Sequence, residues 1–143
     1  MAKHMLVPGL LIGLLLIAGP TAASAEATNS PGRADKLGNI QVAVNKAIGA
    51  QAKTVEVTTS GDVLLVARLN SNMNASTHEG RNNEAKAIAS IVASSIGDKP
   101  EYRTVSTIRV DYVIRATAPS KGKVVDSVEF RKGPDGVFNF HQT

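Results

Sequence analysis

The sequence predicts an α+β fold, a two-layer sandwich with two helices packed on one face of a mainly antiparallel sheet, in the order α-β-β-α-β-β-β. Two stretches repeat apolar residues at steps of three and four, which places those residues on one face of a helix. Five shorter stretches are rich in β-branched residues or alternate apolar and polar positions, as strands with a buried face do. Clusters of Gly, Pro, Asn and Asp separate these stretches, and such a sheet buries its apolar face most simply under both helices.

The first helix is expected from Asp35, because the apolar residues that follow share one helical face, and Gly49 is the candidate terminator. Those residues are Leu37, Ile40, Val44, Ala47 and Ile48. A hairpin follows, in which residues 55–58 alternate valine with polar side chains and residues 63–69 are almost continuously aliphatic. The second of these strands is therefore predicted to be buried on both faces.

The second helix is expected after residues 70–78, which are rich in Asn and Ser and predict a loop. Ser76 followed by Glu79 fits a capping box, and Gly97 ends the apolar stripe. The stripe consists of Ala85, Ile88, Ile91 or Val92, and Ile96.

Three strands complete the domain, at residues 108–115, 124–130 and 137–141, with a tight Gly-Pro-Asp-Gly turn before the last. Their aromatic side chains are expected on the inner face, where they would supply most of the core volume. These residues are Tyr112, Phe130, Phe138 and Phe140.

Residues 1–25 have the features of a cleavable export signal, with an apolar run followed by small residues that include Ala23 and Ala25. Cleavage after Ala25 would leave a flexible leader at residues 26–34 and a single domain at residues 35–143, periplasmic or secreted. A membrane anchor is the alternative, but about 13 apolar residues cover roughly 20 Å, short of the ~30 Å hydrocarbon core.

The composition excludes several chemistries. The chain has no Cys, which excludes disulfides, thiol catalysis and Cys-based metal sites. His78 and His141 are the histidines outside the signal, and neither stands at a metal-ligand spacing, so we expect no metal and no cofactor. The net charge of +4 is a weak bias toward anionic surfaces, and ordinary solubility charge is the favoured explanation.

One constellation of charged residues is predicted on the outward face of the C-terminal strands. It comprises Arg109, Asp111, Arg115, Lys123, Glu129, Arg131 and His141. The favoured interpretation is a solvated face with cross-strand ion pairs. A second interpretation is a basic surface for anionic lipid or polyanion, and its candidate binding residues are Arg109, Arg115, Lys123 and Arg131. A third is an acid/base site, whose candidate residues are Asp111, Glu129 and His141.

Residues 35–115 contain four segments in a recognisable order. They are a first helix at residues 40–48, Ser-Gly-Asp-Val-Leu-Leu at the turn into the second strand at residues 60–65, a second helix at residues 79–92, and Ile-Arg-Val in the third strand at residues 108–110. This pattern resembles a BON domain, the small α-β-β-α-β module of the bacterial cell envelope. The resemblance implies a periplasmic role at membranes or protein assemblies, with contact to phospholipid. Ala67 departs from the pattern, since such domains usually carry Gly there.

The sequence therefore predicts a small exported binding module of the bacterial cell envelope rather than an enzyme. The expected partner is an envelope protein or an anionic lipid surface, and nucleic acid is not expected because the aromatic residues are predicted to point inward. The alternative is a small exported enzyme that uses the three acid/base residues named above.

Overall fold

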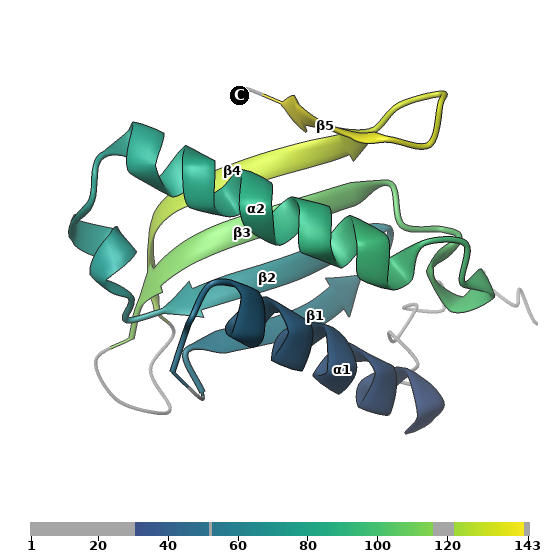
Figure 1. The fold of residues 1–143 in the computed structure, drawn as a ribbon, viewed down its shortest axis with the longest axis horizontal. Coiled ribbons are helices and arrows are strands. Elements are labelled where there is room, and N and C mark those ends of the chain that lie inside the picture. The colour runs from purple at the N-terminus through teal and green to yellow at the C-terminus, as the bar shows by residue number, and fades with distance from the viewer. Residues whose placement is uncertain (1–30, 52, 116–121, 142–143) are drawn as a thin grey trace, which may run out of the picture.

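The computed structural model describes residues 31–51, 53–115 and 122–141, and its element order confirms the predicted α-β-β-α-β-β-β succession (Figure 1). The predicted export signal and residues 26–30 of the predicted leader lie outside the described residues. The elements are α1 (Pro31–Ala47), β1 (Val55–Ser60), β2 (Val63–Leu69), the short 3-10 helix η1 (Asn72–Ala75), α2 (His78–Ile96), the 3-10 helix η2 (Pro100–Tyr102), β3 (Thr107–Ile114), β4 (Lys123–Lys132) and β5 (Phe138–His141).

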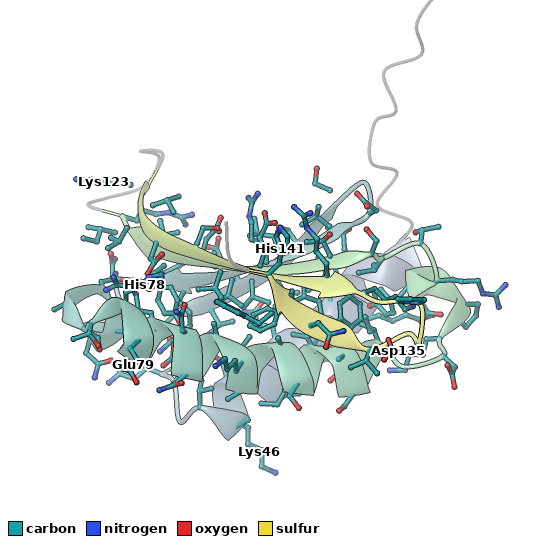
Figure 2. The ribbon with its side chains drawn as sticks, turned by 90° about the horizontal axis from the view of Figure 1, so that it is seen from above. Lys46, His78, Glu79, Lys123, Asp135 and His141 are labelled. Carbon is teal, nitrogen blue, oxygen red and sulfur yellow. The ribbon has the colours of Figure 1, made fainter. Side chains whose placement is uncertain are left out.

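The strands form one five-stranded sheet in the order β1-β2-β3-β4-β5. Neighbouring strands are antiparallel except β2 and β3, which are parallel because α2 connects them as a crossover. Both helices cover the same face: α1 lies over β1, and α2 lies over β3 and β4 (Figure 1). The opposite face, called here the open face, carries no helix in the described part of the chain (Figure 2).

The core lies between the helices and the covered face of the sheet. One row of aligned valines crosses four strands, and all four are buried: Val57, Val66, Val110 and Val128. Val92 of α2 and Val44 of α1 belong to the same cluster and are fully buried. Val92 is thus the more deeply buried of the two candidates, since Ile91 is only partly buried.

The helix boundaries differ from the predicted ones. Helix α1 begins at Pro31, so residues 31–34 of the segment expected as a flexible leader are helical. Helix α2 has Thr77 as its N-cap, with the Thr77 hydroxyl accepting a hydrogen bond from the backbone N–H of Gly80 at 3.1 Å. The predicted capping box of Ser76 and Glu79 is therefore wrong by one residue.

The predicted Asn-rich loop is more ordered than expected, because η1 forms within it and its amides hydrogen-bond β3. The Asn70 side chain accepts a hydrogen bond from the backbone N–H of Arg115 at 2.7 Å and donates one to its carbonyl at 2.9 Å. Asn74 donates to the carbonyl of Val113. These hydrogen bonds tie the loop to the end of β3 and to the residue just beyond it.

The aromatic residues divide into two groups. Tyr112 and Phe130 are buried in the core, as predicted. Phe138 is partly buried and packs against the core, whereas Phe140 is 40% exposed, so the prediction that Phe140 contributes core volume is wrong. Both belong to β5, the edge strand, and α2 is centred over β3 and β4, so their rings lie at the margin of the covered layer.

Candidate functional site

The open face brings the predicted charged residues together. The strand register aligns Arg109, Glu129 and His141 in one row across β3, β4 and β5, and it aligns Asp111 with Ser127 in the next. Partners in register share a face of the sheet. The prediction that these side chains lie on one face is therefore confirmed for the residues of these two rows.

Three of the four predicted binding residues form ion pairs within that face. Arg109 Nη2 donates to Asp111 Oδ2 at 3.2 Å, and Arg131 Nη2 donates to Glu129 Oε2 at 3.5 Å. Arg115 reaches Glu56 of β1 through two bonds of 3.0 and 3.3 Å. Each guanidinium thus has a carboxylate beside it, which lowers the field that the face presents to an anionic surface.

Lys123, the fourth predicted binding residue, lies apart from the other three. The register shifts between Tyr112 and Val113, because β4 carries one extra residue there, and Lys123 then pairs with Ile114. Arg109 and Asp111 of β3 face the open side, and Ile114 has the opposite strand parity. Strict alternation along β4 would place Lys123 on the open face with Glu129 and Ser127. The bulge shifts Lys123 away from that face.

The three candidate acid/base residues meet only in part. Glu129 and His141 are direct partners in register. Asp111 is 6% exposed, and its carboxylate accepts a hydrogen bond of 2.6 Å from Ser127 Oγ as well as the Arg109 contact. Its oxygens are therefore held by structural partners. The two pockets described next lie elsewhere and are not lined by these three residues.

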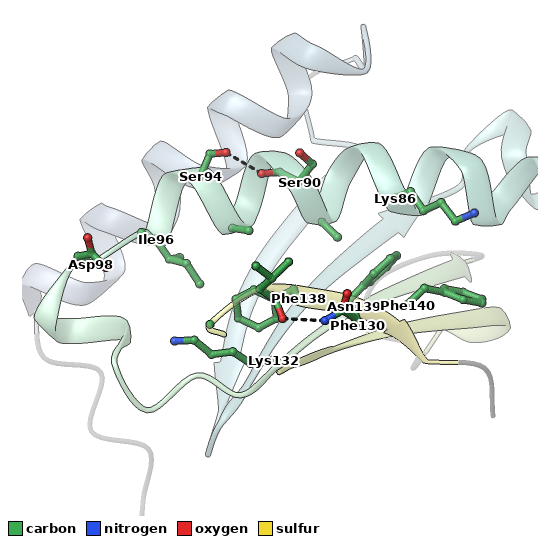
Figure 3. Close-up of a pocket in the computed structure, with 15 residues that line it drawn as sticks. Lys86, Ser90, Ser94, Ile96, Asp98, Phe130, Lys132, Phe138, Asn139 and Phe140 are labelled. Carbon is green, nitrogen blue, oxygen red and sulfur yellow. Dashed lines mark hydrogen bonds between the residues drawn. The ribbon is translucent and has the colours of Figure 1, made fainter. Parts of the chain in front are cut away.

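The larger pocket is a groove of about 640 Å³ between the C-terminal half of α2 and the β4–β5 hairpin (Figure 3). We call it the α2–β5 groove. Its apolar wall consists of Ala89, Ala93, Ile96, Phe130, Phe138 and Phe140. Helix α2 presents small side chains to the hairpin here, so the helix does not fill the space over β5. The exposed parts of Phe138, Phe140 and Val137 then line an open apolar surface.

The rings in this groove are held in defined positions. Phe130 and Phe140 are direct cross-strand partners and pack edge to face, with centroids 5.9 Å apart and an interplanar angle of 61°. Because Phe130 is buried in the core, it anchors the exposed ring of Phe140. The groove therefore presents a preformed aromatic wall.

Two lysines border the groove. Lys86 Nζ lies 5.5 Å from the centroid of Phe140, and Lys132 Nζ lies 5.8 Å from that of Phe138. Figure 3 shows them at opposite ends of the groove, with Asp98 as the acidic side chain among the lining residues. Neither lysine forms an ion pair within the described residues. The groove thus combines an aromatic wall with the polar side chains of Ser90, Ser94 and Asn139 and has a lysine at each end, with Asp98 on the side away from Lys86 (Figure 3).

The second pocket, of about 480 Å³, contains a buried ion pair. The Arg68 side chain is 6% exposed, and its Nε donates to Glu84 Oε1 at 2.8 Å. Arg68 Nη2 also donates to Ser71 Oγ at 2.9 Å. These bonds engage the guanidinium on several sides, so we assign the pair a structural role. Burial, followed by the charge of Glu84, raises the pKa of the neighbouring Tyr112 hydroxyl.

Asp126 links β4 to the start of α2. Its carboxylate accepts a hydrogen bond from Arg81 Nε at 2.7 Å and lies 2.7 Å from His78 Nδ1. Burial raises the pKa of Asp126, but the hydrogen bonds from Arg81 and His78 outweigh it, and the net pKa is below the usual value. The His78 side chain is exposed and pairs with Asp126.

Two other kinds of site are absent from the described residues. These residues contain no cluster of three or more side chains able to hold a metal ion, and no helix among them is long and apolar enough to cross a membrane. Comparison with known protein families, with curated proteins and with solved structures found no match to this chain. The resemblance to BON domains therefore stays a prediction.

Sequence reasoning missed the α2–β5 groove. Two signals point toward it: Phe138 and Phe140 alternate on the last strand of the described residues, and small residues recur on α2 where it faces them. An edge strand has only one neighbour, so its apolar side chains are less completely covered than those of central strands. The groove was not predicted because Phe138 and Phe140 were both expected in the core.

Proposed function

We propose that this chain is a small exported binding module of the bacterial cell envelope and that the α2–β5 groove is its binding site. The observation that supports the proposal is the partly exposed aromatic wall of Phe138 and Phe140 beside a lysine at each end. Ligand sites are typically concave and mostly apolar, with a few polar groups that orient the ligand. The groove is concave and combines exposed aromatic rings with several polar groups that could orient a ligand.

The chemistry of the groove favours a ligand with an apolar body and negative charge. The rings of Phe138 and Phe140 offer apolar contact area, and both lysine ammonium groups are within reach of an anion over that surface. Burying the exposed part of a phenylalanine contributes about 25 cal/mol for each Å² removed from water. The location in the envelope rests on the predicted signal at residues 1–25 and on the resemblance to BON domains.

The open face is the second candidate binding surface. Its arginines are paired with carboxylates, so binding there to an anionic lipid surface would be weak and sensitive to salt. The enzyme alternative has one observation in its favour, the direct register of Glu129 with His141. Hydrolysis of an ester, phosphate or glycan that disappears in His141→Ala would support the enzyme and overturn the binding-module proposal.

A differential capture experiment tests the groove. Tagged wild-type protein and Ala93→Phe are incubated with envelope extract, and the retained components are compared by mass spectrometry. Ala93 lines the groove and is partly buried, so a phenylalanine there fills part of the space. We expect a component that the wild type retains and Ala93→Phe does not.

Ala87→Phe is the matched control, because Ala87 is exposed on the same helix and does not line the groove. It should retain the same component as the wild type. Thermal melting followed by circular dichroism verifies that both variants fold. Equal retention by the wild type and Ala93→Phe would exclude the groove as the site.

A further inference from the structure

The outer edge of β5 is free of strand partners within the described residues. β5 is the last strand in the sheet order and pairs only with β4. An edge strand presents a row of backbone N–H and C=O groups that can pair with another chain. Natural edges are usually blocked by Pro, a bulge or charged side chains, and the register of β4 with β5 has no shift.

The register identifies which backbone groups face outward. Gly133 N–H donates to the Val137 carbonyl, so these two residues form a hydrogen-bonded pair. Such pairs recur every second residue in an antiparallel ladder. Asn139 and His141 therefore direct their backbone groups toward β4, whereas Phe138 and Phe140 direct theirs toward the open edge.

The outward-facing residues are the same ones whose rings line the groove. A strand added to β5 would form hydrogen-bonded pairs with Phe138 and Phe140, and partners in register share a face. Two side chains of the added strand, about 7 Å apart, would then point over the groove. The positions flanking them on the same face would lie toward Lys86 and Lys132, which border the two ends (Figure 3).

We propose that β5 and the α2–β5 groove together bind an extended acidic segment of a partner protein by strand addition. This inference rests on the proposed function and specifies its ligand. The segment has apolar side chains at the two groove-facing positions opposite Phe138 and Phe140 and a carboxylate at each flanking position. Backbone hydrogen bonds supply affinity in this mode, and the pockets for alternate side chains supply specificity.

Charge complementarity selects this occupant over a second copy of the chain. Pairing two β5 edges would bring two sets of Lys86 and Lys132 together, in a protein whose net charge is already positive. Like charges in an interface oppose association. A lipid chain would fill the groove without using the backbone groups of the edge.

The probe is the peptide acetyl-Glu-Thr-Val-Thr-Val-Thr-Glu-amide, which places Val at the central groove-facing positions and Glu at the outer ones. The exported protein, labelled with ¹⁵N, is titrated and followed by NMR and calorimetry. We expect the amide protons of Phe138 and Phe140 to exchange at least tenfold more slowly at saturation. A peptide with Lys in place of both Glu residues should bind at least tenfold more weakly.

The double variant Lys86→Glu/Lys132→Glu changes only exposed side chains and tests the charge assignment. It should lose at least tenfold in affinity for the Glu peptide and gain affinity for the Lys peptide. Unchanged affinities would show that the lysines do not contact the segment.

A pair of variants at Phe140 tests the edge. Proline removes a backbone N–H that faces outward, so the ladder with β4 is expected to persist. Phe140→Ala removes the ring and keeps the N–H. Phe140→Pro should bind the peptide at least fivefold more weakly than Phe140→Ala, with amide spectra that confirm a folded sheet. Equal binding by the two variants would overturn strand addition.

The remaining outcomes assign a different occupant. Slow exchange at Phe138 and Phe140 without peptide, increasing with protein concentration, would identify a second copy. Displacement of the peptide by decanoate or phosphatidylglycerol vesicles, with shifts in the groove and no protection of these amides, would identify a lipid chain. Either result overturns the acidic segment. If the peptide fails while capture still depends on Ala93, the proposed function stands and this inference alone is wrong.

Discussion

Replacing Glu84 with Gln tests how much of the stability rests on the buried ion pair. The substitution keeps the shape of the side chain and removes the charge opposite Arg68, whose side chain is 6% exposed. Breaking a buried pair by removing one partner costs about 3–5 kcal/mol, because the remaining charge stays out of water. Glu84 is 15% exposed and Ser71 still accepts from the guanidinium, so we expect a loss near the lower end.

A loss of about 3 kcal/mol corresponds to a melting temperature about 12 °C lower, at roughly 4 °C for each kcal/mol in a domain of this size. Urea unfolding followed by circular dichroism at pH 7 measures the free energy directly. Glu79→Gln is the control, since it removes an acid from the exposed first turn of the same helix and should cost less than about 1 kcal/mol.

The double variant Arg68→Met/Glu84→Leu completes the test. Apolar residues of similar volume remove both charges at once, so its stability should lie within about 1 kcal/mol of the wild type. If Glu84→Gln costs no more than the Glu79→Gln control, water reaches the guanidinium, and the assignment of the pair to the buried layer is refuted.

Four other results are expected. Val110→Ala should cost about 1–4 kcal/mol by lost transfer and cavity terms, and an unchanged urea midpoint would contradict its place in the core. Because the pKa of Asp126 is lowered in the folded state, its carboxylate stabilises the fold above the usual pKa, and this stability is lost as the pH falls through the folded pKa. Asp126→Asn should therefore be less stable than the wild type at pH 7, and its free energy of unfolding, measured in urea, should fall less steeply at acidic pH. An equally steep fall in the variant would contradict this role of Asp126. N-terminal sequencing of the exported product should begin at Glu26, and a full-length membrane-bound product would contradict cleavage. Binding to anionic vesicles should be weak, fall with added salt and fall further in Arg109→Ala/Arg131→Ala; salt-insensitive binding would point to an apolar contact instead.

Local patterns in the sequence were sufficient to predict the fold class. The three- and four-residue spacing of Ile40 and Val44 predicted the buried side of α1, and the alternation around Val110 predicted the buried side of β3. Such periodicity depends on backbone geometry within a few residues, so it can be read without knowing the partners. The same alternation predicted that Arg109 and Glu129 face the side away from the helices.

The groove proposed as the binding surface depends on contacts between distant segments, and only the tertiary structure revealed it. Lys123 does not lie on the open face, because one extra residue in β4 shifts the register of β4 against β3. Arg68 has the same strand parity as the buried Leu64 and Val66 of β2, so it points to the covered layer, where an ion pair with Glu84, sixteen residues further on, compensates its burial. Phe138 and Phe140 have the alternation of core residues, but β5 lies at the edge of the sheet and α2 does not cover it fully. Burial depends on which elements become neighbours, and strand order and helix placement are set by the packing of the whole chain rather than by the residues of any one segment.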